Sequence, residues 1–348
     1  MGKDAFMLGD SHKSHKIEMP NRELYLDIAR GIAILFVVMF HVTSNHLIAS
    51  WFEIFQLYIF FFVSGCLFRN CKLKTFLFKK VKNILVPYFA WGGITLAYYL
   101  LIEQRFRNLP LKFVDCLFGL FTGIEAQLDF NSPLWFVSCF LMVSMVYLLL
   151  YKTIYGIFKV WKGRLCWTYL LLFFVIACWC VAFNLFDVKW RLFSIYKVPK
   201  FLMAYLIGNV FETYILKHVK KLKNWQLIFI GIILIAISGL LHHALDIKIL
   251  TIISAVCATI SLSIGIGKQK LLETIGKESF TIMCIHGPIY RVIVFFAGKI
   301  LNSDTEAVRS YVLLSILISV ITVLVCLLVK QCITIVDQII SKRIVGFN

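Results

Sequence analysis

The feature that most constrains this chain is a series of apolar stretches, each close to twenty residues long, that recurs along its whole length. A helix of about twenty apolar residues crosses the hydrocarbon core of a bilayer, and lipid offers no partner for free backbone polar groups. Each stretch must therefore be helical, and the continuous runs do not alternate as barrel strands would. We predict an all-α, polytopic membrane bundle of about ten helices, over residues 26–47, 51–68, 84–103, 134–152, 167–186, 199–215, 225–241, 247–265, 278–298 and 309–334.

Composition and charge agree with a membrane protein. Hydrophobic residues make up 60% of the chain, more than a water-facing globule usually carries. The net charge of +18 arises from short Lys and Arg clusters in alternate connections between the apolar stretches. This pattern is typical of cytoplasmic loops beside an anionic leaflet, and not of a nucleic-acid-binding surface. The positive-inside rule predicts cytoplasmic termini and a multi-pass protein of the cell inner (cytoplasmic) membrane.

The chain is expected to hold one membrane domain, residues 25–335, between cytoplasmic tails at residues 1–24 and 336–348. The first tail lacks the apolar core and cleavage site of a signal peptide. Two longer outer loops are expected, residues 104–133 and 187–198, and either could contact a substrate or be an ordinary connection. The first loop contains "LKFVDCLFGLFTG", which is too short to span and suits an interfacial or re-entrant helix. The eleven cysteines lie mostly in apolar stretches without metal-ligand spacing, so neither disulfides nor a metal site are expected.

Ionisable residues inside the first stretch point to a polar site within the bundle. Arg30 and His41 are about three helical turns apart, so they share one face and lie roughly 16 Å apart along the axis. Asp27 precedes Arg30 by nearly one turn and can pair with it. A charge facing lipid is costly, so these groups should face the bundle interior or an aqueous cavity. A snorkelling arginine and a structural histidine are the simpler alternatives.

Other stretches carry further candidates. The ninth holds Glu278, His286 and Arg291, and its Gly287-Pro288 pair should distort the helix and free a carbonyl near His286. An anionic ligand would serve as a partner for Arg291. Ser64-Gly65, in the second stretch, suits either close helix packing or a ligand. Asn131 and Trp135 open the fourth stretch and offer polar contacts at the outer face, although an aromatic belt also explains Trp135.

Four motifs in this order resemble those of the acyltransferase family 3 membrane proteins, which include bacterial polysaccharide and sugar O-acetyltransferases. They are "LDIARGIAILFVVMFH", "FFFVSG", "SPLWFV" and "SFTIMCIHGP". The first contains an Arg and a His at the family spacing, here Arg30 and His41. The last departs from the pattern, because Met283 replaces the usual aromatic residue. The "VMFHV" form is also similar to the fucose 4-O-acetylase-like branch of the family.

The resemblance implies transfer of an acyl group, most often acetyl, from cytoplasmic acetyl-CoA or another acyl-CoA to a hydroxyl of a glycan or lipid-linked sugar. It implies catalytic roles for His41 and His286, with His41 as the general base. Residues implied to contact the acyl donor are Arg30, Asp27, Ser64 and Arg69. Residues implied to contact the acceptor are Trp135, Asn131, Arg291 and Glu278. Membrane lipid is the expected environment, and no metal is implied.

A transporter or flippase of a lipid-linked saccharide is the alternative, since intramembrane charges and a distorted helix would suit it. The sequence also leaves open the identity of the acceptor, the acyl chain, the side on which the acceptor is modified and the oligomeric state. Direct transfer and a covalent acyl-enzyme both remain open.

Overall fold

The computed structural model describes residues 24–107, 111–158, 160–161, 163–187 and 190–345. The described part is almost entirely helical and contains no strand, which confirms the all-α fold. The expected N-terminal tail lies outside the described residues except for its last residue. At the other end, the last helix continues to Val345, through most of the segment expected as a C-terminal tail.

The first half of the chain contains α1 (Leu24–Val42), α2 (His46–Cys66), α3 (Leu73–Lys80), η1 (Val81–Leu85), α4 (Val86–Tyr98), η2 (Tyr99–Glu103), α5 (Gln104–Arg107), α6 (Phe113–Thr122), η3 (Glu125–Gln127), η4 (Asp129–Asn131) and α7 (Leu134–Ile157). The second half contains α8 (Arg164–Leu185), η5 (Leu192–Lys197), α9 (Val198–Val210), η6 (Phe211–Ile215), α10 (Leu216–Val219), α11 (Asn224–His243), α12 (Lys248–Ile266), α13 (Lys270–Lys277), α14 (Ser279–Ile300), α15 (Thr305–Ser310) and α16 (Val312–Val345).

Nine helices within the described residues are long and apolar enough to cross a membrane. The chain is therefore a multi-pass membrane protein. Nine of the expected stretches correspond to these helices. The stretch at 199–215 is also helical, in α9 and η6, but it is not among the nine. The short apolar segment in the first long loop forms α6, a helix of only 10 residues.

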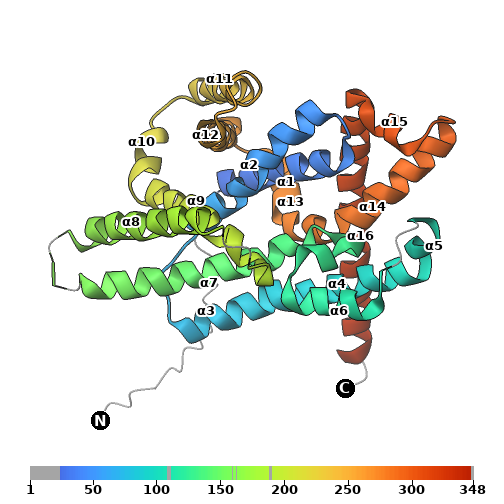
Figure 1. Ribbon diagram of the computed structural model, residues 1–348, viewed down its shortest axis with the longest axis horizontal. Helices are drawn as coiled ribbons and strands as arrows, with labels where there is room; N and C mark the ends of the chain where they lie inside the picture. The colour runs from blue at the N-terminus through green and yellow to red at the C-terminus, as the bar shows by residue number, and fades with distance from the viewer. Residues whose placement is uncertain (1–23, 108–110, 159, 162, 188–189, 346–348) are drawn as a thin grey trace, which may run out of the picture.

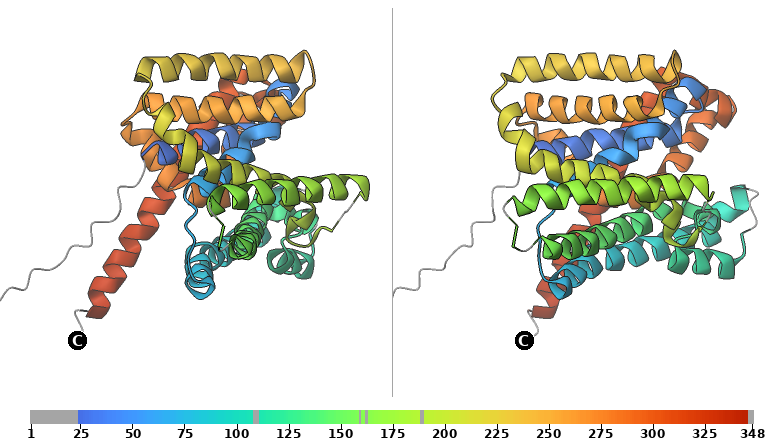
Figure 2. Two further views of the ribbon diagram at one scale, coloured as in Figure 1. Left: turned by 90° about the vertical axis from the view of Figure 1, so that its left-hand side faces the viewer. Right: turned by 60° about the vertical axis from the view of Figure 1, so that its left-hand side comes forward.

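The helices pack as layers around α1, which contacts α2, α12, α13, α14 and α16. Figure 2 shows α11 and α12 stacked on one side of α1 and α2, with α9, α8 and α7 following on the other side. The helix α14 packs against α4 and α16. The helix α16 (red) runs nearly upright across the other helices in Figure 1 and obliquely in Figure 2. Because α1 is central, side chains on it can face several helices at once.

The third spanning helix is longer than the sequence suggested and is widened twice. It runs continuously from Leu73 to Arg107, so much of the expected inner loop is helix. Its α-helical turns are interrupted by two π-helical segments, η1 and η2. A π-helical turn shifts the direction of the side chains that follow, and such turns often lie at functional sites. Each of the two segments lies next to one of the cavities described below.

Glycine lets α2 and α9 approach closely. A Cβ atom on Gly65 would collide with the carbonyl oxygen of Tyr205, and one on Gly208 would collide with the carbonyl oxygen of Phe62. Small residues commonly bring membrane helices together in this way. Of the two sequence interpretations of Ser64-Gly65, Gly65 therefore serves helix packing, whereas the neighbouring Ser64 lines a cavity.

We expect Gly65→Ala to destabilise the protein by about 1–3 kcal/mol, because backbone atoms of α9 cannot move aside as a flexible side chain would. The measurement is the midpoint of thermal unfolding in detergent. Gly93→Ala is the matched control, since a Cβ atom on Gly93 of α4 meets nothing within 4 Å. Equal midpoints for both variants would contradict the close packing of α2 on α9.

Candidate functional site

A basic cavity of about 700 Å³ opens between α1, α2, the start of the long helix 73–107, α7 and α14. We call it the basic cavity. It contains three of the four residues expected to contact the acyl donor, Arg30, Ser64 and Arg69. Its full lining is Arg30, Phe60, Ser64, Leu67, Phe68, Arg69, Cys71, Phe76, Lys79, Lys80, Asn83, Ile84, Phe136, Val137, Phe140, Tyr205, Lys277, Ser279, Phe280 and Met283.

Positive charge dominates this cavity. Two arginines and three lysines line it, and none of the described residues in its lining is acidic. Lys80 Nζ donates a hydrogen bond to Ser144 Oγ at 3.1 Å and lies 5.1 Å from the centre of the Phe140 ring. Several cations around one cavity in a partly desolvated region favour a ligand with several negative charges.

The sequence analysis missed Lys79, Lys80, Asn83 and Lys277 as cavity residues. The three lysines belong to inner loops whose lysines were expected, as a group, to hold phosphates together with Arg30, but none of the three was singled out. In the structure Lys79 and Lys80 belong to helix α3, directly before the π-helical η1, which places their side chains at the cavity. A helical pattern across residues 73–83 was the available signal.

Arg30 is held in place by Asp27, as expected. Its Nη1 donates to Asp27 Oδ1 at 2.9 Å, and the aspartate is buried. The following glycine has a packing role: a Cβ atom on Gly31 would collide with the carbonyl oxygen of Leu272 in α13. Gly276 makes the reciprocal close approach to the carbonyl oxygen of Asp27. The two residues of this Arg-Gly pair therefore have different roles. Arg30 lines the cavity, and Gly31 allows the close contact with α13, whose last residue, Lys277, lines the same cavity.

The two histidines expected to be catalytic lie together. The rings of His41 and His286 are 5.1 Å apart between centroids, and the ring of Tyr290 stacks on His41 at 6.5 Å. His286 is fully buried, whereas His41 is half-buried. The sequence placed these residues on different helices, and only the packing of α14 on α1 brings them together.

The hydrogen bonding of His286 fixes its tautomer. Its Nδ1 lies 2.9 Å from the carbonyl oxygen of Ile282, so Nδ1 carries the proton and donates. Nε2 is then an unprotonated acceptor, and this buried atom has no hydrogen-bond partner among the described residues. A buried acceptor without a partner is unfavourable, and such atoms are commonly completed by a ligand, a proton donor or water.

Pro288 lies inside α14 without ending the helix. The helix continues from Ser279 to Ile300 with the proline inside it. The proline has no N–H group for the carbonyl of Cys284, and Asn131 supplies the missing donor, with Nδ2 2.7 Å from that oxygen. Asn131 is completely buried, and its Oδ1 has no partner among the described residues. A free carbonyl group near His286 was expected from the sequence, but the Asn131 side chain that donates to it was not.

A second cavity, of about 620 Å³, lies beyond the histidines toward the far ends of α14 and the long helix 73–107. We call it the aromatic cavity. Its lining is Tyr98, Ile102, Glu103, Phe106, Arg107, Tyr290, Arg291, Val292, Val294, Phe295, Phe296, Thr305 and Arg309. Along α14, the basic cavity reaches Met283 and the aromatic cavity begins at Tyr290, so His286 lies between them.

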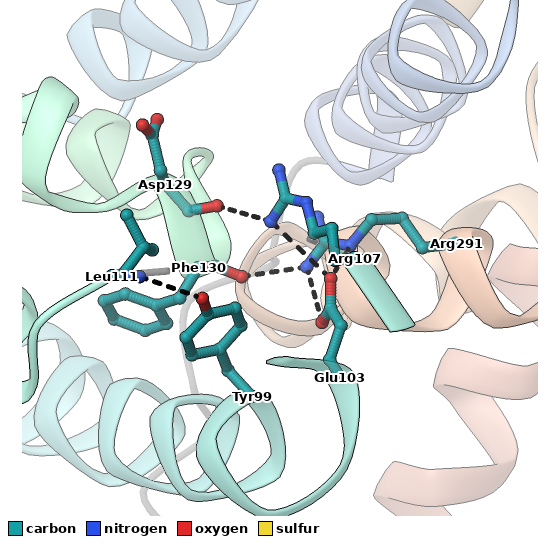
Figure 3. Close-up of polar contacts among 7 residues, drawn as sticks. All are labelled: Tyr99, Glu103, Arg107, Leu111, Asp129, Phe130 and Arg291. Carbon is teal, nitrogen blue, oxygen red and sulfur yellow. Dashed lines mark hydrogen bonds and ion pairs between the residues drawn. The ribbon is translucent and has the colours of Figure 1, made fainter. Parts of the chain in front are cut away.

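Arg291 has a partner within the protein, Glu103, in addition to any ligand. Its Nε lies 2.6 Å from Glu103 Oε1, and its Nη2 donates to Glu103 Oε2 and to the carbonyl oxygen of Phe130 (Figure 3). Arg107 is a second cation beside the same carboxylate, at 3.5 Å, and donates to the carbonyl oxygen of Asp129. Glu103 is buried in η2, where the sequence shows only a charged residue at the end of a span.

The other two residues expected to contact the acceptor lie elsewhere. Trp135 is covered by Lys197, whose Nζ is 3.4 Å from the ring centre and 2.7 Å from Glu125 Oε2. This contact joins the two long loops. Glu278 lies at the start of α14, beside the basic cavity and roughly 20 Å along the helix from Arg291. The structure therefore does not gather Trp135, Asn131, Arg291 and Glu278 at one place.

We expect Glu103→Gln and Arg291→Gln to be strongly coupled. Removing one partner leaves the other charge in a poorly solvated position, whereas removing both does not. A double-mutant cycle of unfolding in mixed micelles should give a coupling energy of about 1–3 kcal/mol. The control is the more distant pair Glu273 and Lys277, whose charged atoms are 3.8 Å apart and whose lysine is about half exposed; it should give less than about 0.5 kcal/mol. Additive effects for the first pair would contradict its structural role.

Comparison with known proteins identifies the family of the chain. The model of a family described as an acyltransferase domain (Acyl_transf_3) matches residues 23–330, which include both cavities and both histidines. Searches of curated proteins and of solved structures gave no significant match. The likeness to the fucose 4-O-acetylase branch stays a prediction. Because the match covers most of the sequence, the chain belongs to acyltransferase family 3 and is a membrane acyltransferase.

Proposed function

We propose that this protein transfers an acyl group, most simply acetyl, from cytoplasmic acyl-CoA to a hydroxyl of a glycan or lipid-linked sugar. The observation that carries the proposal is the position of the His41–His286 pair between a strongly basic cavity and a second, largely apolar cavity. A donor and an acceptor can then approach the same histidines from different ends of the bundle.

The basic cavity suits the donor. CoA carries several phosphate charges, and Arg30, Arg69 and the neighbouring lysines offer guanidinium and ammonium donors. The apolar wall formed by Phe136, Phe140 and Met283 can cover the pantetheine arm as it extends toward the histidines. If this cavity faces the cytoplasm, its lysine-rich surroundings also obey the positive-inside rule.

The histidines suit the proton transfer. As the acceptor oxygen attacks the thioester carbonyl carbon, a C–O bond forms, the C–S bond breaks and CoA leaves as the thiolate. The hydroxyl proton passes to His41, which is half-buried and so can reach substrate. We assign His286 as the positioning partner, because its ring is fully buried and its unprotonated Nε2 can accept a hydrogen bond from a neighbouring N–H group.

Loss of the base should separate chemistry from binding. In proteoliposomes with radiolabelled acetyl-CoA and glycan acceptors, we expect His41→Ala to lower kcat by at least about 100-fold, while CoA binding is retained. His286→Ala should lower kcat less and alter the pH profile. Wild-type acetylation by His41→Ala would overturn the mechanism. Movement of a lipid-linked saccharide by the wild type, without consumption of acyl-CoA, would favour the transporter alternative.

Loss of cations in the basic cavity should weaken donor binding. We expect Arg30→Gln and Lys79→Gln each to raise the Kd for CoA several-fold to tenfold, with the effect reduced at high salt. Lys268→Gln is the matched control, because this exposed lysine does not line the cavity. Equilibrium binding of labelled CoA to the full-length protein is the measurement. Equal loss in the control, or no CoA binding by the wild type, would contradict the donor assignment.

A further inference from the structure

Two residues that line the aromatic cavity also contact His41 or the end of α1. Tyr290 stacks on the ring of His41. Arg309 binds the end of α1, where its Nε donates to the carbonyl oxygen of Val42 at 2.8 Å and its Nη2 donates to that of His41 at 3.2 Å. A ligand in this cavity would therefore lie beside the last turn of α1, which carries the proposed base.

Positively charged side chains outnumber negatively charged ones in the lining of this cavity. Its lining contains three arginines, Arg107, Arg291 and Arg309, and one carboxylate, Glu103. Arg291 and Arg107 share that carboxylate (Figure 3), and the partners of Arg309 among the described residues are backbone carbonyl oxygens. The excess of two positive charges at this end of the bundle favours an anionic group in the ligand. Guanidinium groups bind phosphate particularly well.

The mouth of the cavity is apolar and open. Phe106 is 69% exposed and Phe296 is 57% exposed, and both belong to helices that are long and apolar enough to span the membrane. Ile102 and Phe295 beside them are exposed as well. Exposed apolar side chains on spanning helices favour contact with lipid over water, so we expect the cavity to be reached from within the bilayer. An apolar chain could lie against them while the charged group reaches the arginines.

We infer that the acyl acceptor binds in the aromatic cavity as a membrane-resident amphiphile, a saccharide joined through phosphate to a long apolar chain. The inference rests on the proposed function and narrows it, because it excludes a free, water-soluble saccharide as the preferred acceptor. The arginines hold the phosphate, the phenylalanines hold the start of the chain, and a hydroxyl of the saccharide extends toward His41. The acceptor arrives laterally from the bilayer, whereas the donor arrives through the basic cavity.

The test uses the full-length protein in phosphatidylcholine proteoliposomes. Three acceptors share one saccharide: a polyprenyl-diphosphate saccharide, the same saccharide on a neutral long alkyl chain, and the free saccharide. A diazirine in the polyprenyl chain allows photolabelled peptides to be mapped. We expect kcat/KM to fall in the order given, with at least about a tenfold step at the loss of phosphate. Labelling should map to residues 102–107 and 290–296.

Substitutions test separately how the charged group and the apolar chain of the acceptor contribute to binding. Arg107→Gln should lower kcat/KM for the diphosphate acceptor about tenfold and leave the neutral alkyl acceptor nearly unchanged, and Arg107→Lys should restore part of the loss. Phe296→Ala should weaken both lipid acceptors. The matched controls are Arg105→Gln and Phe174→Ala, which are exposed and lie outside the cavity lining. Neither control should change these values.

Three results would overturn the inference: equal use of the free saccharide, labelling outside the two segments, or displacement of the photolabel by an equal concentration of phosphatidylglycerol. The last would indicate an ordinary phospholipid site. Acylation of the free saccharide without labelling of the cavity would leave the proposed function intact and refute this inference alone. Specific labelling without any acyl transfer or CoA binding would support the lipid site and refute the proposed function.

Discussion

The structure depends on one constraint: within the bilayer a polar group finds its partner inside the protein or not at all. Asp27 holds Arg30, Glu103 holds Arg291, and Asn131 takes the carbonyl that Pro288 leaves free. Each contact joins groups that would be costly alone, so each fixes the position of a helix. Buried atoms that depart from this pattern include the Oδ1 of Asn131 and the Nε2 of His286, and the second lies beside the proposed base.

Close contacts between helix backbones fix the positions of these polar groups. The approach of α9 to α2 at Gly65 and of α13 to α1 at Gly31 leaves little freedom for the helices to slide. Because α1 lies at the centre, its two ends are fixed against different neighbours: α13 beside Arg30, and Arg309 beside His41. Rigid placement of this kind suits acyl transfer, where the reacting atoms must be held in a narrow geometry.

The long helix 73–107 links the two ends of the site. Its first π-helical segment follows Lys79 and Lys80 of the basic cavity, and its second contains Glu103 of the aromatic cavity. In the proposed reaction the donor is a highly charged molecule dissolved in water, whereas the acceptor carries an apolar chain and resides in the bilayer. Separate cavities with different linings allow each substrate to be recognised by its own chemistry, with the histidines where the two meet.

The membrane class and most spanning segments can be predicted without the structure, because hydropathy over about twenty residues reports directly on a bilayer core. The sequence also predicts the shared face of Arg30 and His41 and the pair formed with Asp27, since helical periodicity is local. Only the tertiary structure decided which residues from different helices meet. The pairing of His41 with His286, the carboxylate of Glu103 beside Arg291, and the lysines of α3 in the basic cavity all depend on helix packing and π-helical turns. Helix packing and π-helical turns leave no periodic signal in the sequence. The continuous α14 shows the same limit, because the carbonyl that Pro288 leaves free takes its donor from a distant segment, at Asn131.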